Sequence, residues 1–338
     1  MLISVSGDSP SCDPVAALTS VFRRYRGEMD QGALLRTARE AARVSLRSMA
    51  RMTNYSPAYL SLIESGKRPA SHEVVCAYER ALGADLERLS AVSDSPAKVD
   101  SSSLDEVAVM LSATRRIEDA AGPASVLTVV QGMSTITERF ADQARSQHAA
   151  RAAALASEVT QYRGWLEHAT GAGKASLRSL DRSIALAKHA CGRDQLAHGL
   201  SFSAYVRLER GRLDEAAQMV DAVLSVPRLH PLIRVYERYQ HARVLAVAGD
   251  RHGAERALLL ADSEADAAAD EPPPDAGYWY TPGFFGLQRA RVLRTVGEIE
   301  RSREVVAQSL QSMPEDHSTA EWAAKWRRAA AGDGDVPH

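Results

Sequence analysis

Residues 44–68 read VSLRSMARMTNYSPAYLSLIESGKR, and this stretch decides the fold of the N-terminal part of the chain. Its first half carries small and apolar residues at i, i+3, i+4 and i+7, which lie on one helix face: Leu46, Met49, Ala50 and Thr53. Ser45 stands just before this run and is a good N-cap, because its hydroxyl can accept a hydrogen bond from a first-turn N–H. The pattern predicts a short helix that begins after Ser45.

The second half of the stretch predicts another short helix after a tight turn. Asn54 tolerates the left-handed backbone that such a turn needs. Ser56 and Pro57 are an N-cap and a proline at the first helical position. Leu60 and Ile63 are the apolar anchors, and the opposite face carries Ala58, Ser61, Leu62 and Ser65 before Gly66 ends the helix. Two short helices with a free outer face are typical of a DNA-binding helix-turn-helix, although a hairpin that only packs would share the pattern.

The wording of this stretch resembles the lambda-repressor-like, or xenobiotic-response-element (XRE), family. The matching positions are Ala50, Leu60-Ser61, Ile63 to Gly66 and Pro69. The resemblance extends from a preceding helix, Gly32 to Arg43, through two following helices up to about Leu89. It implies a five-helix DNA-binding domain over residues 21–89, which binds double-stranded DNA as a homodimer across two half-sites.

The resemblance also assigns roles to single residues. It implies that the start and outer face of the second helix meet base edges, with Arg47 reaching a base or a phosphate; the residues are Arg47, Pro57, Ala58, Tyr59, Ser61 and Leu62. Phosphate contacts are expected from Ser45, Ser56, Ser65, Lys67 and Arg68, which set register without reading sequence. A basic residue of the first helix, here Arg39, is expected to pair with Glu64. Since Ala58 and Leu62 can only pack against thymine methyl groups, we expect a modest polar readout.

Charge is distributed unevenly along a chain whose net charge is −2. Residues 21–69 carry +6, and the residues after Pro69 carry −6. A basic end joined to an acidic body suits a protein that touches phosphates with one end only. Arg23, Arg24 and Arg26 either form an arm against DNA phosphates or start a solvated helix.

The remaining sequence is helical in pattern, and we predict an all-α protein. Residues 1–20 and 331–338 are expected to be disordered, and the Ser-, Asp- and Pro-rich residues 90–103 to be a linker. Within 104–330, a helix ends at glycine and a second helix follows, at separations of 40, 38 and 48 residues: Gly171, Gly211, Gly249 and Gly297. These periods indicate a solenoid of helical hairpins, with an irregular bundle as the alternative.

Two segments of this region, QYRGWLEHATG at 161–171 and GRDQLAHGLSF at 192–202, resemble the degenerate tetratricopeptide (TPR) domain that follows an XRE headpiece in many actinobacterial regulators. The resemblance implies a TPR-like domain over 104–330 for sensing and dimerisation. Its candidate ligand groove comprises Trp165, Tyr205, Arg207, Arg234, Tyr236, Arg238, Tyr239, Tyr278 and Trp279, with Tyr162 beside them. Tyr278 and Trp279 belong to an insert, EPPPDAGYWYTPGFF at 271–285. The insert either lines a ligand cavity or packs onto the core as a plug, and the second interpretation is favoured.

The sequence offers no catalytic constellation, so we expect no enzyme, no metal and no cofactor. His72-Glu73 begins like a zinc-protease helix, but Val75 and Cys76 stand where its second histidine is needed. The three cysteines are far apart, which fits a reducing cytosol, and no apolar run is long enough to span a membrane. We therefore expect a cytoplasmic protein.

The function expected is that of a dimeric, sequence-specific transcription regulator whose headpiece spacing responds to a small molecule or peptide bound by the TPR-like domain. TPR-type peptide receptors often hold the peptide backbone with asparagines. Asn54 is the only asparagine of the chain, which lowers the expectation of a peptide. The alternative is an interaction scaffold that recruits a partner protein and binds DNA weakly.

Overall fold

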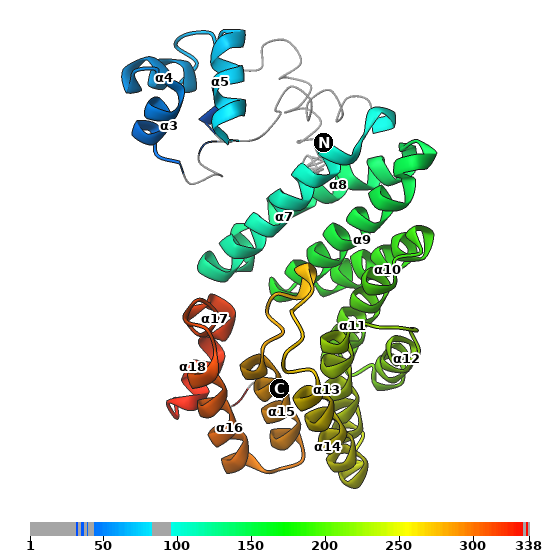
Figure 1. Cartoon of the computed structure of the whole chain (residues 1–338). Helices are drawn as coiled ribbons and strands as arrows, with labels where there is room; N and C mark the ends of the chain where they lie inside the picture. The colour runs from blue at the N-terminus through cyan, green and yellow to red at the C-terminus, as the bar shows by residue number, and fades with distance from the viewer. Residues whose placement is uncertain are drawn as a thin grey trace, which may run out of the picture. The chain divides into compact units, whose positions relative to one another are not determined.

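The structure, a computed structural model of the chain, describes residues 44–82 and 96–333, together with Gly32, Leu35, Arg36, Arg39 and Val336, and gives no side-chain description for Ser146 and Asp275. The chain divides into two compact units, Met1–Ser90 and Ala91–His338, which we call the headpiece and the solenoid unit (Figure 1). All regular secondary structure in the described ranges is helical, which confirms the all-α prediction.

The headpiece contains α3 (Leu46–Thr53), α4 (Pro57–Glu64) and α5 (His72–Leu82). Their core is fully buried and comprises Leu35, Met49, Leu60, Ile63, Val74 and Tyr78. The Ser45 hydroxyl accepts from the backbone N–H of Ser48 at 3.1 Å, so α3 begins where its cap predicts. Asn54 has a φ of 57°, which is the left-handed turn predicted between the two helices.

Several predicted features of the N-terminal part lie outside the described residues. They are the disordered segment 1–20, the basic residues Arg23, Arg24 and Arg26, and the last headpiece helix at 85–89. Of the predicted first helix, only Gly32, Leu35, Arg36 and Arg39 are described, and all four are helical.

The second half of the predicted linker carries structure. A 3-10 turn, η1 (Pro96–Lys98), precedes α7 (Ser101–Ala121), and Val99 between them is buried. The Asp100 carboxylate accepts from the backbone N–H of Ser103 at 3.0 Å, so a residue that composition assigns to a linker is the N-cap of a helix. At the other end, Val336 of the predicted disordered tail is buried in a hydrophobic cluster with Trp326.

The solenoid unit is a row of antiparallel helix pairs that follows α7. The first pair is preceded by η2 (Pro123–Ser125) and α8 (Leu127–Gln143). The pairs are α9 (Ser146–Ala169) with α10 (Gly173–Ala190), α11 (Arg193–Glu209) with α12 (Leu213–Leu224), α13 (Pro231–Val247) with α14 (Arg251–Ala267), and α15 (Pro282–Thr295) with α16 (Ile299–Ser312). The end is capped by α17 (Glu315–Thr319), η4 (Glu321–Ala323) and α18 (Ala324–Ala330). The first helices of the pairs, α9, α11, α13 and α15, contact one another in order, as in a solenoid of hairpins.

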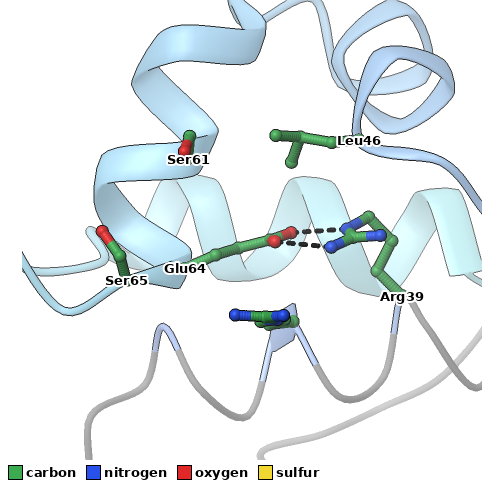
Figure 2. A pocket seen from close by; sticks show the side chains of 6 residues that line it. Arg39, Leu46, Ser61, Glu64 and Ser65 are labelled. Carbon is green, nitrogen blue, oxygen red and sulfur yellow. Dashed lines mark hydrogen bonds and ion pairs between the residues drawn. The ribbon is translucent and has the colours of Figure 1, made fainter.

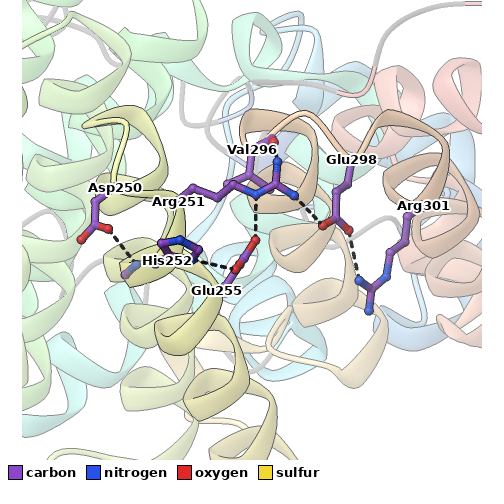
Figure 3. Close-up of polar contacts among 8 residues, drawn as sticks. Asp250, Arg251, His252, Glu255, Val296, Glu298 and Arg301 are labelled. Carbon is purple, nitrogen blue, oxygen red and sulfur yellow. Dashed lines mark hydrogen bonds and ion pairs between the residues drawn. The ribbon is translucent and has the colours of Figure 1, made fainter.

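The turn inside each pair is made by glycine. Gly171, Gly211, Gly249 and Gly297 have φ values of 87°, 72°, 80° and 91°, in the left-handed region that residues with a Cβ rarely adopt. Figure 3 shows how two successive turns are joined: Arg251 donates to the carbonyl of Val296 and to the carboxylate of Glu298, both at 3.2 Å. The repeating glycine of the sequence is therefore a repeating backbone conformation.

The aromatic insert packs onto the solenoid unit as a plug. It contains a short turn, η3 (Asp275–Gly277), and runs into α15. Tyr280 and Phe285 are 2% and 4% exposed and belong to the main hydrophobic core with Tyr236. The Tyr278 hydroxyl donates to Asp119 of α7 at 2.5 Å, and the Trp279 ring lies edge-on to Phe202 of α11. The insert, drawn in yellow to orange in Figure 1, thus links α7 to the first helices.

Candidate DNA-binding site

Helix α4 has one buried and one exposed face. Leu60 and Ile63 are fully buried, and Glu64 is 7% exposed. The opposite side and the residues that follow the helix are exposed: Pro57, Ala58, Ser61, Leu62, Ser65, Gly66, Lys67 and Arg68. Arg47, in the first turn of α3, is exposed as well. All predicted base-reading residues except Tyr59 therefore present their side chains at the surface.

Tyr59 is half-buried, and its ring is the centre of a small stack. The Tyr55 ring lies 5.4 Å away, and the guanidinium of Arg68 lies over the Tyr59 ring at 4.7 Å from its centroid. A cation over an exposed tyrosine face gains about 0.5–1 kcal/mol. Tyr59 therefore supports Arg68, which the sequence interpretation treated as an independent phosphate contact.

Three serines expected at phosphates also hold the helix ends. Ser56 accepts from the backbone N–H of Tyr59 at 3.2 Å, and Ser45 caps α3 in the same way. The Ser65 hydroxyl donates to the Leu62 carbonyl at 3.2 Å, at the end of α4. A phosphate bound here would share these hydroxyl groups with the caps.

A buried charge network fixes α4 to its neighbours. Arg39 donates from Nε and Nη2 to the two carboxylate oxygens of Glu64, both at 2.7 Å, so the predicted ion pair is present and bidentate. Arg39 Nη1 also donates to the Val44 carbonyl at 2.9 Å. The Tyr78 hydroxyl donates to Glu64 at 2.8 Å, and its burial, followed by this hydrogen bond, raises the pKa of Tyr78. The network ties the first helix, α4 and α5 together; Tyr78 was not predicted, because nothing in the local spacing relates it to Glu64.

A pocket of about 220 Å³ lies beside the same helix. Figure 2 shows that Arg39 and Glu64 point toward each other between the elements that form it, with Ser61 and Ser65 on α4. The exposed Arg36 lines this pocket too. Arg36 thus places a guanidinium group next to Ser61 and Ser65 of α4, a position that the sequence pattern does not predict.

The candidate groove residues of the solenoid unit are brought together only in part. The rings of Trp165 and Tyr205 lie 6.0 Å apart, and Trp279 reaches Phe202 beside them. Tyr278 binds Asp119 instead, and Tyr162 likewise donates to a carboxylate of α7, Glu118.

Other candidates contact different elements, which corrects the predicted groove. Arg207 pairs with Asp181 of α10 and Glu215 of α12, Arg238 with Glu264 of α14, and the Tyr239 hydroxyl donates to Asp262 of α14. Tyr236 is buried against Tyr280, and Arg234 is half-buried on the same helix. Successive positions of a helix are rotated by about 100°, so the side chains of 234, 236, 238 and 239 as a set point to more than one face of α13.

No cluster of His, Cys, Asp and Glu side chains in the described ranges could hold a metal ion. Nor is any helix of those ranges long and apolar enough to cross a membrane.

Comparisons with known proteins locate the same domain. Residues 31–92 match the family model of a helix-turn-helix domain. No curated protein sequence matches the chain significantly. Among solved structures, the chain is similar to Bacillus thuringiensis PlcR in complex with the peptide PapR7 and DNA, with a TM-score of 0.43 and 13% sequence identity, over 83% of this chain and 94% of that chain. The family match and the geometry agree: residues 31–92 match a helix-turn-helix domain, and α3 and α4 within them are its two helices joined by a tight turn.

Proposed function

We propose that the protein is a sequence-selective, DNA-binding transcription regulator whose helix α4 enters the major groove. The observation that carries this proposal is the outer face of α4, which is exposed within a domain that matches the helix-turn-helix family. The surrounding charge supports it, since residues 21–69 carry +6 in a chain of net charge −2. If both faces of α4 were buried, the helix would have no surface left to contact base edges.

The contacts proposed follow the chemistry of the exposed side chains. Ala58 and Leu62 pack on thymine methyl groups, and Ser61 hydrogen-bonds a base edge. Lys67 and Arg68 bind phosphates, and Arg36 and Arg47 add to the positive field near them. The readout is modest in hydrogen bonds, so DNA shape and half-site spacing supply the remaining selectivity.

We further propose that the protein acts as a homodimer and that the solenoid unit binds an effector that alters the spacing of the two headpieces. A single helix-turn-helix reads few bases, and dimers of such domains read two half-sites about one helical turn apart. Stacked helix pairs offer an extended surface for a ligand. A second candidate function, recruitment of a partner protein by the solenoid unit with auxiliary DNA binding, uses the same surface.

The test is selection of bound duplexes from a random pool by the full chain, followed by affinity measurements over a range of salt concentrations. Lys67→Gln and Arg68→Gln should each lower the salt slope by about one and weaken all sequences alike. Ser61→Ala and Leu62→Ala should change the preferred bases. Arg80→Gln, at an exposed position of α5, is the matched control and should do neither.

A palindromic selected site would support both DNA reading and a dimer. A pool that yields no common site, or a site preference that changes with Lys67→Gln rather than with Leu62→Ala, would contradict the proposal.

A further inference from the structure

A cluster of charged and aromatic side chains lies where the first helices of the solenoid unit meet. Arg243 of α13 and Arg291 of α15 are each 6% exposed, and both guanidinium groups lie near the Tyr205 ring of α11, at 5.4 and 5.0 Å from its centroid. Both also donate to one carboxylate oxygen of Glu209, Arg291 at 3.2 Å and Arg243 at a shorter contact. We call these four residues the arginine–tyrosine cluster.

Several cationic side chains surround Tyr205 and Glu209 of this cluster. Two buried guanidinium groups share Glu209, whose side chain is 27% exposed. His168 of α9 lies 5.6 Å from the Tyr205 ring. Burial lowers the pKa of His168 most; Glu209 opposes this, while Arg210, Arg291 and Lys325 lower the pKa further. Three cations, Arg210, Arg291 and Lys325, thus lower the pKa of His168, in the part of the chain that carries an overall negative charge.

One donor of the cluster is left without an acceptor. Arg243 Nη1 is buried and has no hydrogen-bond partner among the described residues, whereas Nη2 donates to Glu209. Burial, and then the charge of Arg291, lowers the pKa of Arg243, while Glu209 and Tyr205 oppose the shift. A buried charged donor without a partner is costly. A carboxylate lying in the guanidinium plane would accept from both Nη atoms at once, which Glu209 does not do.

The cluster has an aromatic wall beside this donor. Trp165 of α9 and Phe202 of α11 are half-buried, and their rings lie 5.8 Å apart, with Tyr205 6.0 Å from Trp165. These ring faces offer a surface to a planar, apolar group next to a cationic centre. Glu209 is the last residue of α11, where the helix dipole disfavours a negative charge, and it is free to turn toward solvent.

We propose that the arginine–tyrosine cluster is a binding site for a small organic anion, a carboxylate carried on a planar apolar body. The ligand carboxylate takes the place of Glu209 between Arg243 and Arg291, and the apolar body packs on Trp165. The proposal rests on the proposed function in taking the solenoid unit as the effector-binding part, and it names the chemistry of that effector. No covalent step is involved; one internal ion pair is exchanged for an external one.

The experiment uses the full chain with benzoate as the minimal ligand and benzamide as its neutral counterpart, followed by calorimetric titration and thermal unfolding. Benzoate should bind at millimolar concentration and raise the unfolding temperature, and benzamide should not. Glu209→Gln should increase benzoate affinity about tenfold, because the internal competitor is removed. Arg243→Gln should reduce the affinity at least tenfold. Arg238→Gln, on the same helix but paired with Glu264 of α14, should leave it unchanged.

The opposite signs expected for Glu209→Gln and Arg243→Gln separate binding from a merely structural role. If Arg243→Gln loses its helical circular dichroism, Arg243→Lys replaces it; it keeps the charge but cannot form a two-pronged pair, so it should also bind more weakly. Absence of benzoate binding, equal binding of benzamide, or an unchanged affinity in Glu209→Gln would overturn the site.

A second arm identifies the source of the carboxylate. The tripeptide Ala-Ala-Phe is titrated with a free and with an amidated C-terminus; binding of the free form alone, tighter than benzoate, assigns the site to peptide C-termini, and the reverse order assigns it to free small acids. Operator binding is measured on the same preparations. Lost DNA binding with intact benzoate binding contradicts the proposed function alone, and the converse contradicts the anion site alone.

Discussion

Glu237 is a carboxyl group that the fold buries completely. Its Oε2 accepts from the hydroxyl of Ser201 at 2.6 Å and from the side-chain amide of Gln240 at 3.3 Å. Burial raises the pKa of Glu237 to about 8, and these two hydrogen bonds oppose the shift only in part. The group is therefore largely protonated in the folded state at neutral pH, while the same residue in the unfolded chain is ionised.

This shift makes the stability of the solenoid unit fall as the pH rises. Below the unfolded pKa of 4.5, Glu237 is protonated in both states; between 4.5 and about 8 only the unfolded state releases the proton, which costs up to about 5 kcal/mol of folding free energy. Glu237→Gln imitates the protonated form, so its urea midpoint should change little between pH 6.5 and 8 while the midpoint of the wild type falls. Glu300→Gln, at an exposed position, should follow the wild type.

His198 sets the other limit of the pH range. It is 3% exposed, and burial lowers its pKa to about 3, so stability is lost as the pH falls below 6.5 and only the unfolded state gains the proton. His198→Gln should therefore flatten the acid side of the profile and leave the alkaline side. If Glu237→Gln shifted the midpoint equally at every pH, the assignment of the alkaline limit to this carboxyl would be wrong.

For single residues, the sequence predicts those roles that depend only on neighbours along the chain. Ser45, Asn54 and Ser56 act through their nearest neighbours, so spacing alone indicates their roles. The Arg39–Glu64 pair follows from a resemblance. Arg243 was not predicted, because nothing in the sequence distinguishes it from Arg238 five residues earlier. Only the packing of α13 against α11 and α15 buries Arg243, whereas Arg238 pairs with Glu264 of α14.

Each helix pair of the solenoid unit depends on a glycine turn. The four turn glycines have nothing within 4 Å of an added Cβ, so a side chain there is disfavoured by the backbone angle alone. The solenoid period is readable from sequence for this reason, since the positive φ value demands glycine at each turn. The start of α7 could not be predicted in this way. Its N-cap, Asp100, lies in a Ser-, Asp- and Pro-rich segment whose composition is typical of a linker.

Two glycine-to-alanine changes, one at a turn and one inside a helix, should alter stability in opposite directions. Gly211→Ala should destabilise the solenoid unit by about 1–2 kcal/mol, because alanine must adopt a φ of 72° there. Gly132→Ala, inside α8 and also free of neighbours within 4 Å, should stabilise it by about 0.5–1 kcal/mol. Chemical denaturation of the full chain measures both; equal effects of the two changes would contradict the role of the turn.

On the scale of the whole molecule, α7 contacts parts of the solenoid unit that are far from it in the sequence. Glu118 accepts from the Tyr162 hydroxyl at 2.7 Å and from the Trp165 indole at 3.0 Å, and Asp119 accepts from Tyr278. Arg115 pairs with Glu158 at 2.8 Å. Helix α7 is thus held by polar contacts to α9 and to the aromatic insert. Sequence patterns predicted two parts and their helices, but contacts between residues so far apart leave no period to detect.

Removal of the Tyr278 hydroxyl should loosen α7. Burial raises the pKa of Asp119, and the bond from Tyr278 opposes that shift, so Tyr278→Phe leaves a half-buried carboxylate with one donor fewer, at a cost of about 1 kcal/mol. Hydrogen exchange of residues 101–121, followed by mass spectrometry, should become faster. Tyr280→Phe is the matched control, because the Tyr280 hydroxyl is buried and has no partner among the described residues. Unchanged exchange in Tyr278→Phe would show that this bond does not hold α7.

The bond between Asp119 and Tyr278 also has a consequence for biosynthesis, since its partners are 159 positions apart. A ribosome adding about 5–20 residues per second needs roughly 8–30 s to deliver Tyr278 after Asp119. During that interval Asp119 of α7 lacks this partner, while the helix pairs between the two residues are being synthesised. The bond that joins α7 to the aromatic insert can therefore form only late in translation, after the headpiece and three of the helix pairs have been synthesised.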